Sequence, residues 1–320
     1  MKKICAMLLM AGFLLFLCSC GSIQAPGETT EPFALGEPIV PEETTDYPEE
    51  MSELFPEEAF PPTGPETVVV PQPEPGDDEF VPVLDYIPDV VIELKYATED
   101  NFTGQVIYPF RDAFLRYGTV KKLLLAQDIL RTKGLGLKLW DGFRPVSSQH
   151  ILWNVYPDPV YVANPLTGFS SHSRGNTVDI TLVDSDGTEL TMPTGFDDFT
   201  PLADRDYSDC SEEAAENARL LQSVMEEAGF TGYSGEWWHF SDKVSYPVEE
   251  NFEPLPGFLS YAMCEEYITL RKQASAESEE LSKIPKDHIF TVLARSGDFL
   301  LVNYQGLRGY VLESYTQRIE

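Results

Sequence analysis

The chain has few basic residues and few of the residues that most often bind metals. Its 320 residues include 22 Lys and Arg against 53 Asp and Glu, with only four His and five Cys. A net charge of −31 repels phosphate backbones, which argues against a nucleic-acid partner. No C-x-x-C pair is present, so a cysteine-based zinc site is not expected.

Basic residues are absent from positions 21–80, which hold sixteen acids and twelve prolines. Proline interrupts helices and central strands, and like charges repel one another. We therefore expect 21–80 to be a disordered, extended tether, with folded structure starting near Phe80.

The N-terminus has the features of an export signal. Lys2 and Lys3 precede the apolar run Ile4–Leu17, which is short for a membrane span. The run ends in Leu-Cys-Ser-Cys-Gly, which resembles a bacterial lipoprotein signal in which Cys20 receives the lipid. Residues 1–20 are thus expected to direct the chain outside the cytoplasm as a membrane-anchored lipoprotein. A simple secretory signal or a retained N-terminal anchor is the alternative.

Cys210 and Cys264 are the only cysteines beyond this signal. A disulfide is possible outside the cell, but two cysteines 54 positions apart are equally compatible with two separate thiols.

Apolar periodicity indicates mixed secondary structure from 81 to 255. Helices are expected at Val120–Arg131, Ser147–Val155 and Ser211–Ala228; strands are expected at Val81–Leu94, Leu135–Trp140, Thr177–Leu182 and Thr231–Phe240. Because strands and helices do not alternate as βαβ units, the pattern favours an α+β fold.

A second, all-β module is expected at 281–320. Short β-rich runs separated by turns occur at His288–Ala294, Phe299–Tyr304 and Gly309–Leu312. The last run resembles the closing strand of bacterial SH3-like domains, which implies a small barrel that binds cell-wall polymer; a barrel that merely packs on the first domain is the alternative. The charged, helix-like stretch Tyr261–Ser282 is expected to supply the connector, 256–280.

Two histidines lie in segments suited to a catalytic metal. His172 is followed by Asp179, with Gly175 between them to let the chain turn back, and His239 follows Glu236 by three residues. Imidazole and carboxylate are zinc ligands, and a catalytic zinc uses three of them and leaves one position for water. His172, Asp179 and His239 are thus predicted to bind one Zn2+, with Glu236 as the general base. The alternative is that these histidines are structural, as lone histidines more often are.

Six motif-like segments follow one another between about residues 82 and 248: Lys95–Thr98, Asp100–Gly104, Leu139–Pro145, Ser170–Gly175, Phe196-Asp197 and Glu236–His239. Together, and in this order, they resemble the zinc D-alanyl-D-alanine dipeptidases of the VanX type. It implies a central antiparallel sheet with flanking helices, of the D-Ala-D-Ala peptidase/hedgehog-like type, with zinc on the inner face of the sheet.

The resemblance also implies roles for further residues. Arg144 matches the arginine that stabilises the transition state, a role suited to a fixed guanidinium beside a developing oxyanion. Asp197 matches the acid that holds the free ammonium of the dipeptide. Ser170 matches a position that contacts substrate.

The chain departs from the family in its expected export signal, tether and C-terminal module. These features would bring the enzyme to peptidoglycan stem peptides, and the loop between Trp153 and Phe169 looks short for the family. Zinc-dependent hydrolysis of D-Ala-D-Ala is therefore the predicted function. A D,D- or L,D-carboxypeptidase that trims stem peptides is the first alternative, and an inactive wall-binding protein is the second.

Overall fold

The computed structural model describes residues 74–159 and 161–320. The predicted lipoprotein signal with Cys20, and nearly all of the predicted tether, lie outside the described residues. Within the described residues, no helix is both long and apolar enough to cross a membrane.

The first part of the described chain is built around a five-stranded sheet in the order β2-β4-β5-β7-β6. Its strands are β2 (Val91–Ile92), β4 (Gly136–Asp141), β5 (Thr177–Val183), β7 (His239–Asp242) and β6 (Phe230–Gly232). Only β2 and β4 run parallel, and the other neighbours are antiparallel. A separate pair is formed by β1 (Phe80–Pro82) and β3 (Phe114–Arg116). The largely antiparallel sheet confirms the predicted α+β class.

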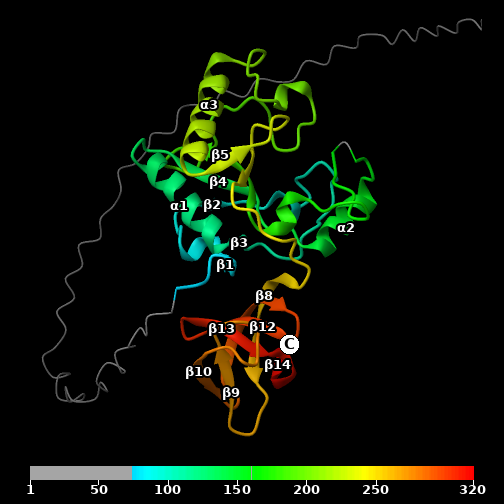
Figure 1. Cartoon of the computed structure of the whole chain (residues 1–320), viewed down its shortest axis with the longest axis vertical. Helices are drawn as coiled ribbons and strands as arrows, with labels where there is room; N and C mark the ends of the chain where they lie inside the picture. The colour runs from blue at the N-terminus through cyan, green and yellow to red at the C-terminus, as the bar shows by residue number, and fades with distance from the viewer. Residues whose placement is uncertain (1–73, 160) are drawn as a thin grey trace, which may run out of the picture. The chain divides into compact units, whose positions relative to one another are not determined.

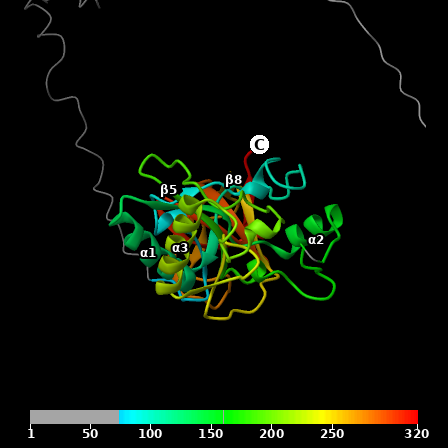
Figure 2. The same ribbon diagram turned by 90° about the horizontal axis from the view of Figure 1, so that it is seen from above.

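Helices α1 (Tyr117–Arg131) and α3 (Glu212–Glu227) lie side by side against this sheet, whereas α2 (Val146–Val155) lies apart from them (Figures 1 and 2). Helix α3 begins where the Ser211 side chain accepts a hydrogen bond from the backbone N–H of Ala214. Its buried stripe includes Ala218, Leu221 and Met225, at helical spacing.

Strand β5 is buried on both faces, and one face is apolar whereas the other carries a polar site residue. Val178, Ile180 and Leu182 belong to the apolar core. Because successive side chains of a strand point to opposite faces, Asp179 lies on the other face, between Val178 and Ile180. This alternation lets one strand serve both the core and a polar site.

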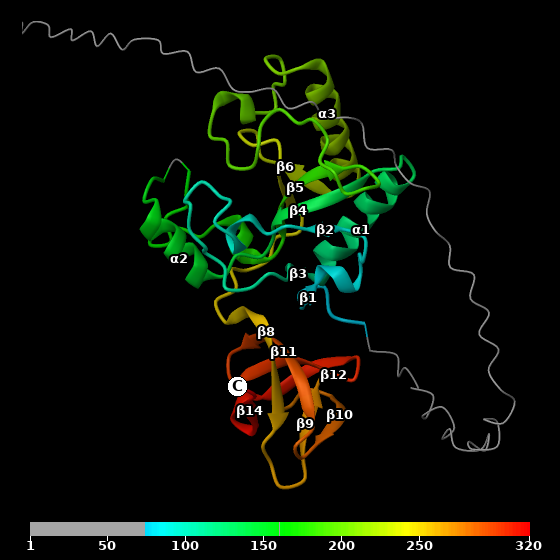
Figure 3. The same cartoon turned by 180° about the vertical axis from the view of Figure 1, so that it is seen from behind.

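The C-terminal part is a seven-stranded sheet in the order β10-β9-β13-β12-β11-β8-β14, coloured orange to red in Figure 3. Its strands are β8 (Phe252–Ala262), β9 (Tyr267–Arg271), β10 (Glu280–Pro285), β11 (Ile289–Ser296), β12 (Phe299–Tyr304), β13 (Leu307–Leu312) and β14 (Thr316–Arg318). The three strands predicted in this part are present, so the all-β character is confirmed.

The helix-like connector predicted at Tyr261–Ser282 is wrong. Its residues form the end of β8, all of β9 and the start of β10. Ile268 and Leu270 are buried in the core of the module, two positions apart as in a strand with one buried face. The surrounding charges lie on the exposed side, and they disguised this two-residue period.

Cys210 and Cys264 are free thiols, which settles the question that the sequence left open.

Candidate active site

Three acidic or imidazole side chains lie in one row across the five-stranded sheet. Asp141 at the end of β4 is paired with Asp179 of β5, and Asp179 is paired with His239 at the start of β7. Residues directly opposite in antiparallel strands place their side chains on the same face, with Cβ atoms about 5 Å apart. The register of the sheet thus brings together residues that are 98 positions apart in sequence.

His172 reaches this row from the short 3-10 helix Ser171–Arg174, which directly precedes β5. Gly175 ends the helix at φ +73°, and a Cβ there would lie 2.4 Å from Phe80. Glycine is required on both counts, as the sequence predicted for the turn. The Nδ1 of His172 donates to the carbonyl oxygen of Gly142 at 2.8 Å, which leaves Nε2 free to bind a metal.

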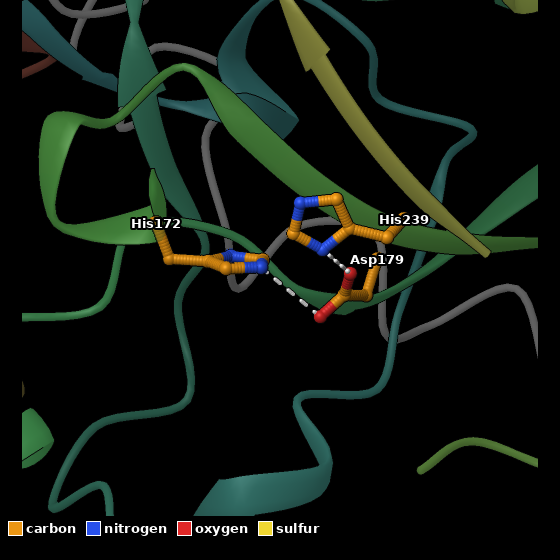
Figure 4. Close-up of side chains that lie close together, drawn as sticks. All are labelled: His172, Asp179 and His239. Carbon is orange, nitrogen blue, oxygen red and sulfur yellow. Dashed lines mark ion pairs between the residues drawn. The ribbon is translucent and has the colours of Figure 1, made fainter. Parts of the chain in front are cut away.

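The three predicted ligands converge on one point (Figure 4). His172 Nε2 lies 3.2 Å from Asp179 Oδ2, and His239 Nδ1 lies 3.0 Å from Asp179 Oδ1. The potential ligand atoms of all three lie within 4.8 Å of one another. Asp179 Oδ1 is buried and makes no well-aligned hydrogen bond, although His239 Nδ1 lies 3.0 Å away. Two imidazoles that converge on one buried carboxylate are a donor set that fits zinc.

The electrostatics of the row favour ionised Asp179. Burial opposes its charge, yet His172 and His239 hold its pKa well below the usual range. Burial also opposes charge on His172, and the carboxylates of Asp179 and Asp141 outweigh it and raise the pKa of that imidazole. The carboxylate charge of Asp179 is therefore present at the place where a dication would sit.

Glu236 lies in the loop between β6 and β7, so the expected strand Thr231–Phe240 is two short strands joined by this loop. Its Oε2 is 3.5 Å from Nδ1 of His239. Burial, followed by the charge of Asp179, raises the pKa of Glu236. When the pKa of a carboxylate lies closer to neutral pH, the group can both accept a proton and return it.

Arg144 is buried and held by a ring of acceptors. Its Nη2 donates to Asp141 Oδ2 at 2.6 Å, its Nε donates to the Tyr108 hydroxyl at 3.2 Å, and its Nη1 donates to Gln149 Oε1 at 3.1 Å. Asp141 is fully buried and its other oxygen accepts from Tyr108 at 2.7 Å. The guanidinium is thus fixed in one orientation beside the row.

Asp197 is joined to Arg144 through an aromatic residue. The Tyr96 hydroxyl donates to Asp197 Oδ2 at 2.6 Å, and the guanidinium carbon of Arg144 lies 5.0 Å from the centre of the Tyr96 ring. Burial raises the pKa of Asp197 to about 8. Its backbone has φ 53°, a conformation that few non-glycine residues adopt.

Ser170 takes a structural role. Its hydroxyl accepts from the backbone N–H of His172 at 3.3 Å and caps the 3-10 helix that carries that ligand. Its predicted contact with substrate stays a prediction.

Sequence reasoning assigned no role to Tyr96, Tyr108, Asp141 or Gln149. Tyr96 and Asp141 lay inside segments already identified as motifs, so a signal existed for them. Tyr108 and Gln149 had none, because their importance arises from contacts with Asp141 and Arg144 that only folding creates.

Comparison with known proteins identifies the family. The model of the D-Ala-D-Ala dipeptidase family matches residues 77–254, more than half of the chain. The chain belongs to this family. A bacterial SH3 domain model matches residues 266–317, as the β-rich pattern there predicted.

Curated relatives agree with the family assignment. The D-alanyl-D-alanine dipeptidase of Escherichia coli K12 is 38% identical over 172 residues, which are 53% of this chain and 89% of that protein. The enzyme of the same name from Enterococcus faecium is 35% identical, over 46% of this chain and 83% of that protein.

Solved structures show a weaker likeness to this dipeptidase-family chain. VanYB in complex with D-alanine-D-alanine is 18% identical with a TM-score of 0.29, over 48% of this chain and 77% of that one. The LdcB LD-carboxypeptidase is 19% identical with a TM-score of 0.32, over 53% of this chain and 69% of that one.

Proposed function

We propose that this chain is a zinc-dependent dipeptidase that hydrolyses D-alanyl-D-alanine. The observation that carries the proposal is the row of Asp141, Asp179 and His239, with His172 and Glu236 beside it and the potential ligand atoms of His172, Asp179 and His239 within 4.8 Å of one another. His172, Asp179 and His239 would hold the metal. Zinc in such a site supplies a Lewis acid that lowers the pKa of a water ligand and polarises the scissile carbonyl.

Glu236 and Arg144 carry out the proton transfer and the charge stabilisation that the reaction also needs. Glu236 accepts a proton from the attacking water and returns it to the leaving amine as the peptide bond breaks. Arg144 donates hydrogen bonds to the carbonyl oxygen as it gains negative charge, and Asp141 and Tyr108 prevent the guanidinium from turning away.

Asp197, with Tyr96 behind it, holds the free ammonium of the substrate. An ammonium beside Asp197 stabilises the ionised carboxylate, so binding releases the proton that the isolated carboxyl keeps near neutral pH. Since this carboxylate recognises a free amino terminus, the site should prefer a dipeptide to a longer peptide with an amide there.

The discriminating experiment compares free D-Ala-D-Ala with a stem pentapeptide that ends in D-Ala-D-Ala. Full-length protein loaded with zinc should cleave the dipeptide and leave the pentapeptide largely intact, and a chelator should abolish the reaction. Comparable release of D-Ala from the pentapeptide would establish the carboxypeptidase alternative instead. Cleavage of neither, in protein that retains zinc, would favour the inactive wall-binding alternative.

We further propose that the chain is exported and anchored in the membrane through a lipid on Cys20, with the C-terminal module bound to cell-wall polymer. The support is the N-terminal sequence and the bacterial SH3 match. Cys20→Ser should move the protein from the membrane fraction to the soluble extracytoplasmic fraction in a bacterial host. Unchanged membrane retention would exclude the lipid anchor, and failure of the wild type to sediment with purified peptidoglycan would exclude the wall-binding role.

A further inference from the structure

The segment between β7 and β8 runs along the 3-10 helix that carries His172. The backbone N–H of Glu249 donates to the carbonyl oxygen of Ser173 at 2.8 Å. Arg174 Nη1 donates to the carbonyl oxygen of Tyr246 at 2.7 Å. Ser173 and Arg174, which follow the predicted ligand His172, are therefore held by the segment that leads directly into β8 of the C-terminal sheet.

Arg116 reinforces this attachment. Its Nε donates to the Arg174 carbonyl oxygen at 3.1 Å, and its Nη2 lies 3.3 Å from Glu249 Oε2. Its guanidinium carbon also lies 4.1 Å from the centre of the Phe80 ring, which is packed against Gly175. The metal-ligand helix thus rests on a surface made by Phe80, Arg116 and Glu249.

Strand β8 contacts the chain on both sides of Arg144, once in the loop before it and once at the start of α2. Phe143, which precedes Arg144, has its ring centre 5.8 Å from that of Phe252. Ser147, three residues after Arg144, donates through its hydroxyl to Glu253 Oε2 at 2.9 Å. Phe252 and Glu253 are the first two residues of β8.

The C-terminal sheet fixes Phe252 in turn. Phe252 is paired with Ser296 of β11 and is 3% exposed. Its ring stacks on Phe80 at 4.5 Å. These aromatic residues form one apolar cluster that also contains Phe114, Phe143 and, from the C-terminal sheet, Ala294, Leu301 and Tyr310.

We propose that Phe252 and Glu253, the first residues of β8, position Arg144 and the metal-ligand helix, and that the C-terminal sheet holds these two residues in place through the pairing of β8 with β11. The inference rests on the proposed dipeptidase function. Both residues lie at the end of the dipeptidase family match, so the C-terminal sheet would support the catalytic centre from the point where the family match ends. Misplacing a catalytic group by about 1 Å can cost about 100-fold in rate, so even small shifts here matter.

The module offers a matched control for Phe252. Phe290 in β11 is 2% exposed and belongs to the separate core of the C-terminal sheet, away from the aromatic cluster. Phe252→Ala and Phe290→Ala remove the same side chain from the same module, and both should lower the melting temperature. In zinc-loaded full-length protein, kept below its melting transition, Phe252→Ala should lower kcat for D-Ala-D-Ala at least tenfold, with KM changed less than twofold. Phe290→Ala should keep kcat within twofold of the wild type.

Equal kcat values for the two variants would overturn the proposal. Ser147→Ala is an independent test, because it removes only the hydrogen bond to Glu253. It should lower kcat about threefold without changing the melting temperature of the module. If either alanine variant fails to fold, Phe252→Leu and Phe290→Leu carry the same comparison with less loss of volume.

Hydrogen exchange separates this proposal from the proposed function. Phe252→Ala should speed amide exchange at residues 142–147 and 171–175 at least tenfold relative to Phe290→Ala, whether or not the wild type hydrolyses the dipeptide. Unchanged exchange there would refute the positioning role even in an active enzyme. Inactivity of the wild type together with the predicted exchange would refute the dipeptidase function alone.

Discussion

The fold keeps the carboxyl group of Asp197 protonated near neutral pH. Replacing Asp197 with asparagine tests both the stability cost of its charge and its proposed role in binding the substrate ammonium. Burial raises its pKa from 3.8 to about 8. Between these values the folded chain holds a proton that the unfolded chain has released. The free energy of unfolding therefore falls as pH rises from about 4 and levels off above about 8.

The size of the effect follows from the shift. Each pKa unit is worth about 1.4 kcal/mol, so the partly buried carboxyl costs on the order of 4 kcal/mol of stability at pH 7 and almost nothing below pH 4. Asparagine is neutral at every pH, can still accept from the Tyr96 hydroxyl, and tolerates the positive φ at this position. Asp197→Asn should therefore raise the free energy of unfolding at pH 7 by about 4 kcal/mol.

Denaturant unfolding at pH 4 and pH 7, on chelator-treated protein, measures this difference. The metal must be removed because a nearby dication lowers the pKa of the wild-type carboxyl. Asp198→Asn makes the same change of charge one residue away, where the carboxylate accepts from the backbone N–H of Thr200 in an exposed loop, and should give no comparable stabilisation.

The same substitution should impair the zinc enzyme. Losing a charge-assisted bond to the substrate ammonium is worth about 1.5–3 kcal/mol, which corresponds to a rise in KM of roughly 10- to 100-fold. If Asp197→Asn is no more stable than the wild type at pH 7, the inferred cost of ionising Asp197 in the folded chain is wrong. An unchanged KM would refute the role of Asp197 in binding the ammonium.

Three further substitutions test the remaining parts of the site. Glu236→Gln should lower kcat by about 10²–10⁴ while zinc content stays at one per chain, because the role proposed for Glu236 is that of a base and not of a ligand; loss of zinc from this variant would contradict the proposed role. Arg144→Lys should lower kcat about 100-fold, because the compact ammonium of lysine lacks the planar fork with which Arg144 spans Asp141, Tyr108 and the substrate; unchanged turnover would exclude oxyanion stabilisation. Tyr96→Phe removes the hydrogen bond that lowers the pKa of Asp197, so the rise of 1/KM with pH should move to higher pH, and an unshifted profile would exclude that coupling.

Local sequence was enough to predict the helices and most strands of the first domain. Helix α3 illustrates why, since its cap at Ser211 and its buried stripe are both encoded within sixteen residues. The metal ligands were also predicted from local spacing, and the wider set of motifs added Arg144 and Asp197. These residue types have few other reasons to occur in such combinations.

The C-terminal module shows where local reasoning failed. The stretch predicted as a helix-like connector is made of strands, because β9 and β10 pair with each other and their exposed charges concealed an alternating pattern. A strand is stabilised by its neighbours, and those neighbours are not visible in its own sequence.

The sequence by itself predicted the zinc ligands and the carboxylate proposed as the base, because imidazole and carboxylate chemistry belongs to residue types and the motifs that carry them are local. Only the tertiary structure decided that Asp141 joins Asp179 and His239 in one row, and that β8 lies against both sides of Arg144. The physical reason is that strand register and the packing of distant aromatic rings depend on how the whole sheet pairs, and no local pattern specifies them.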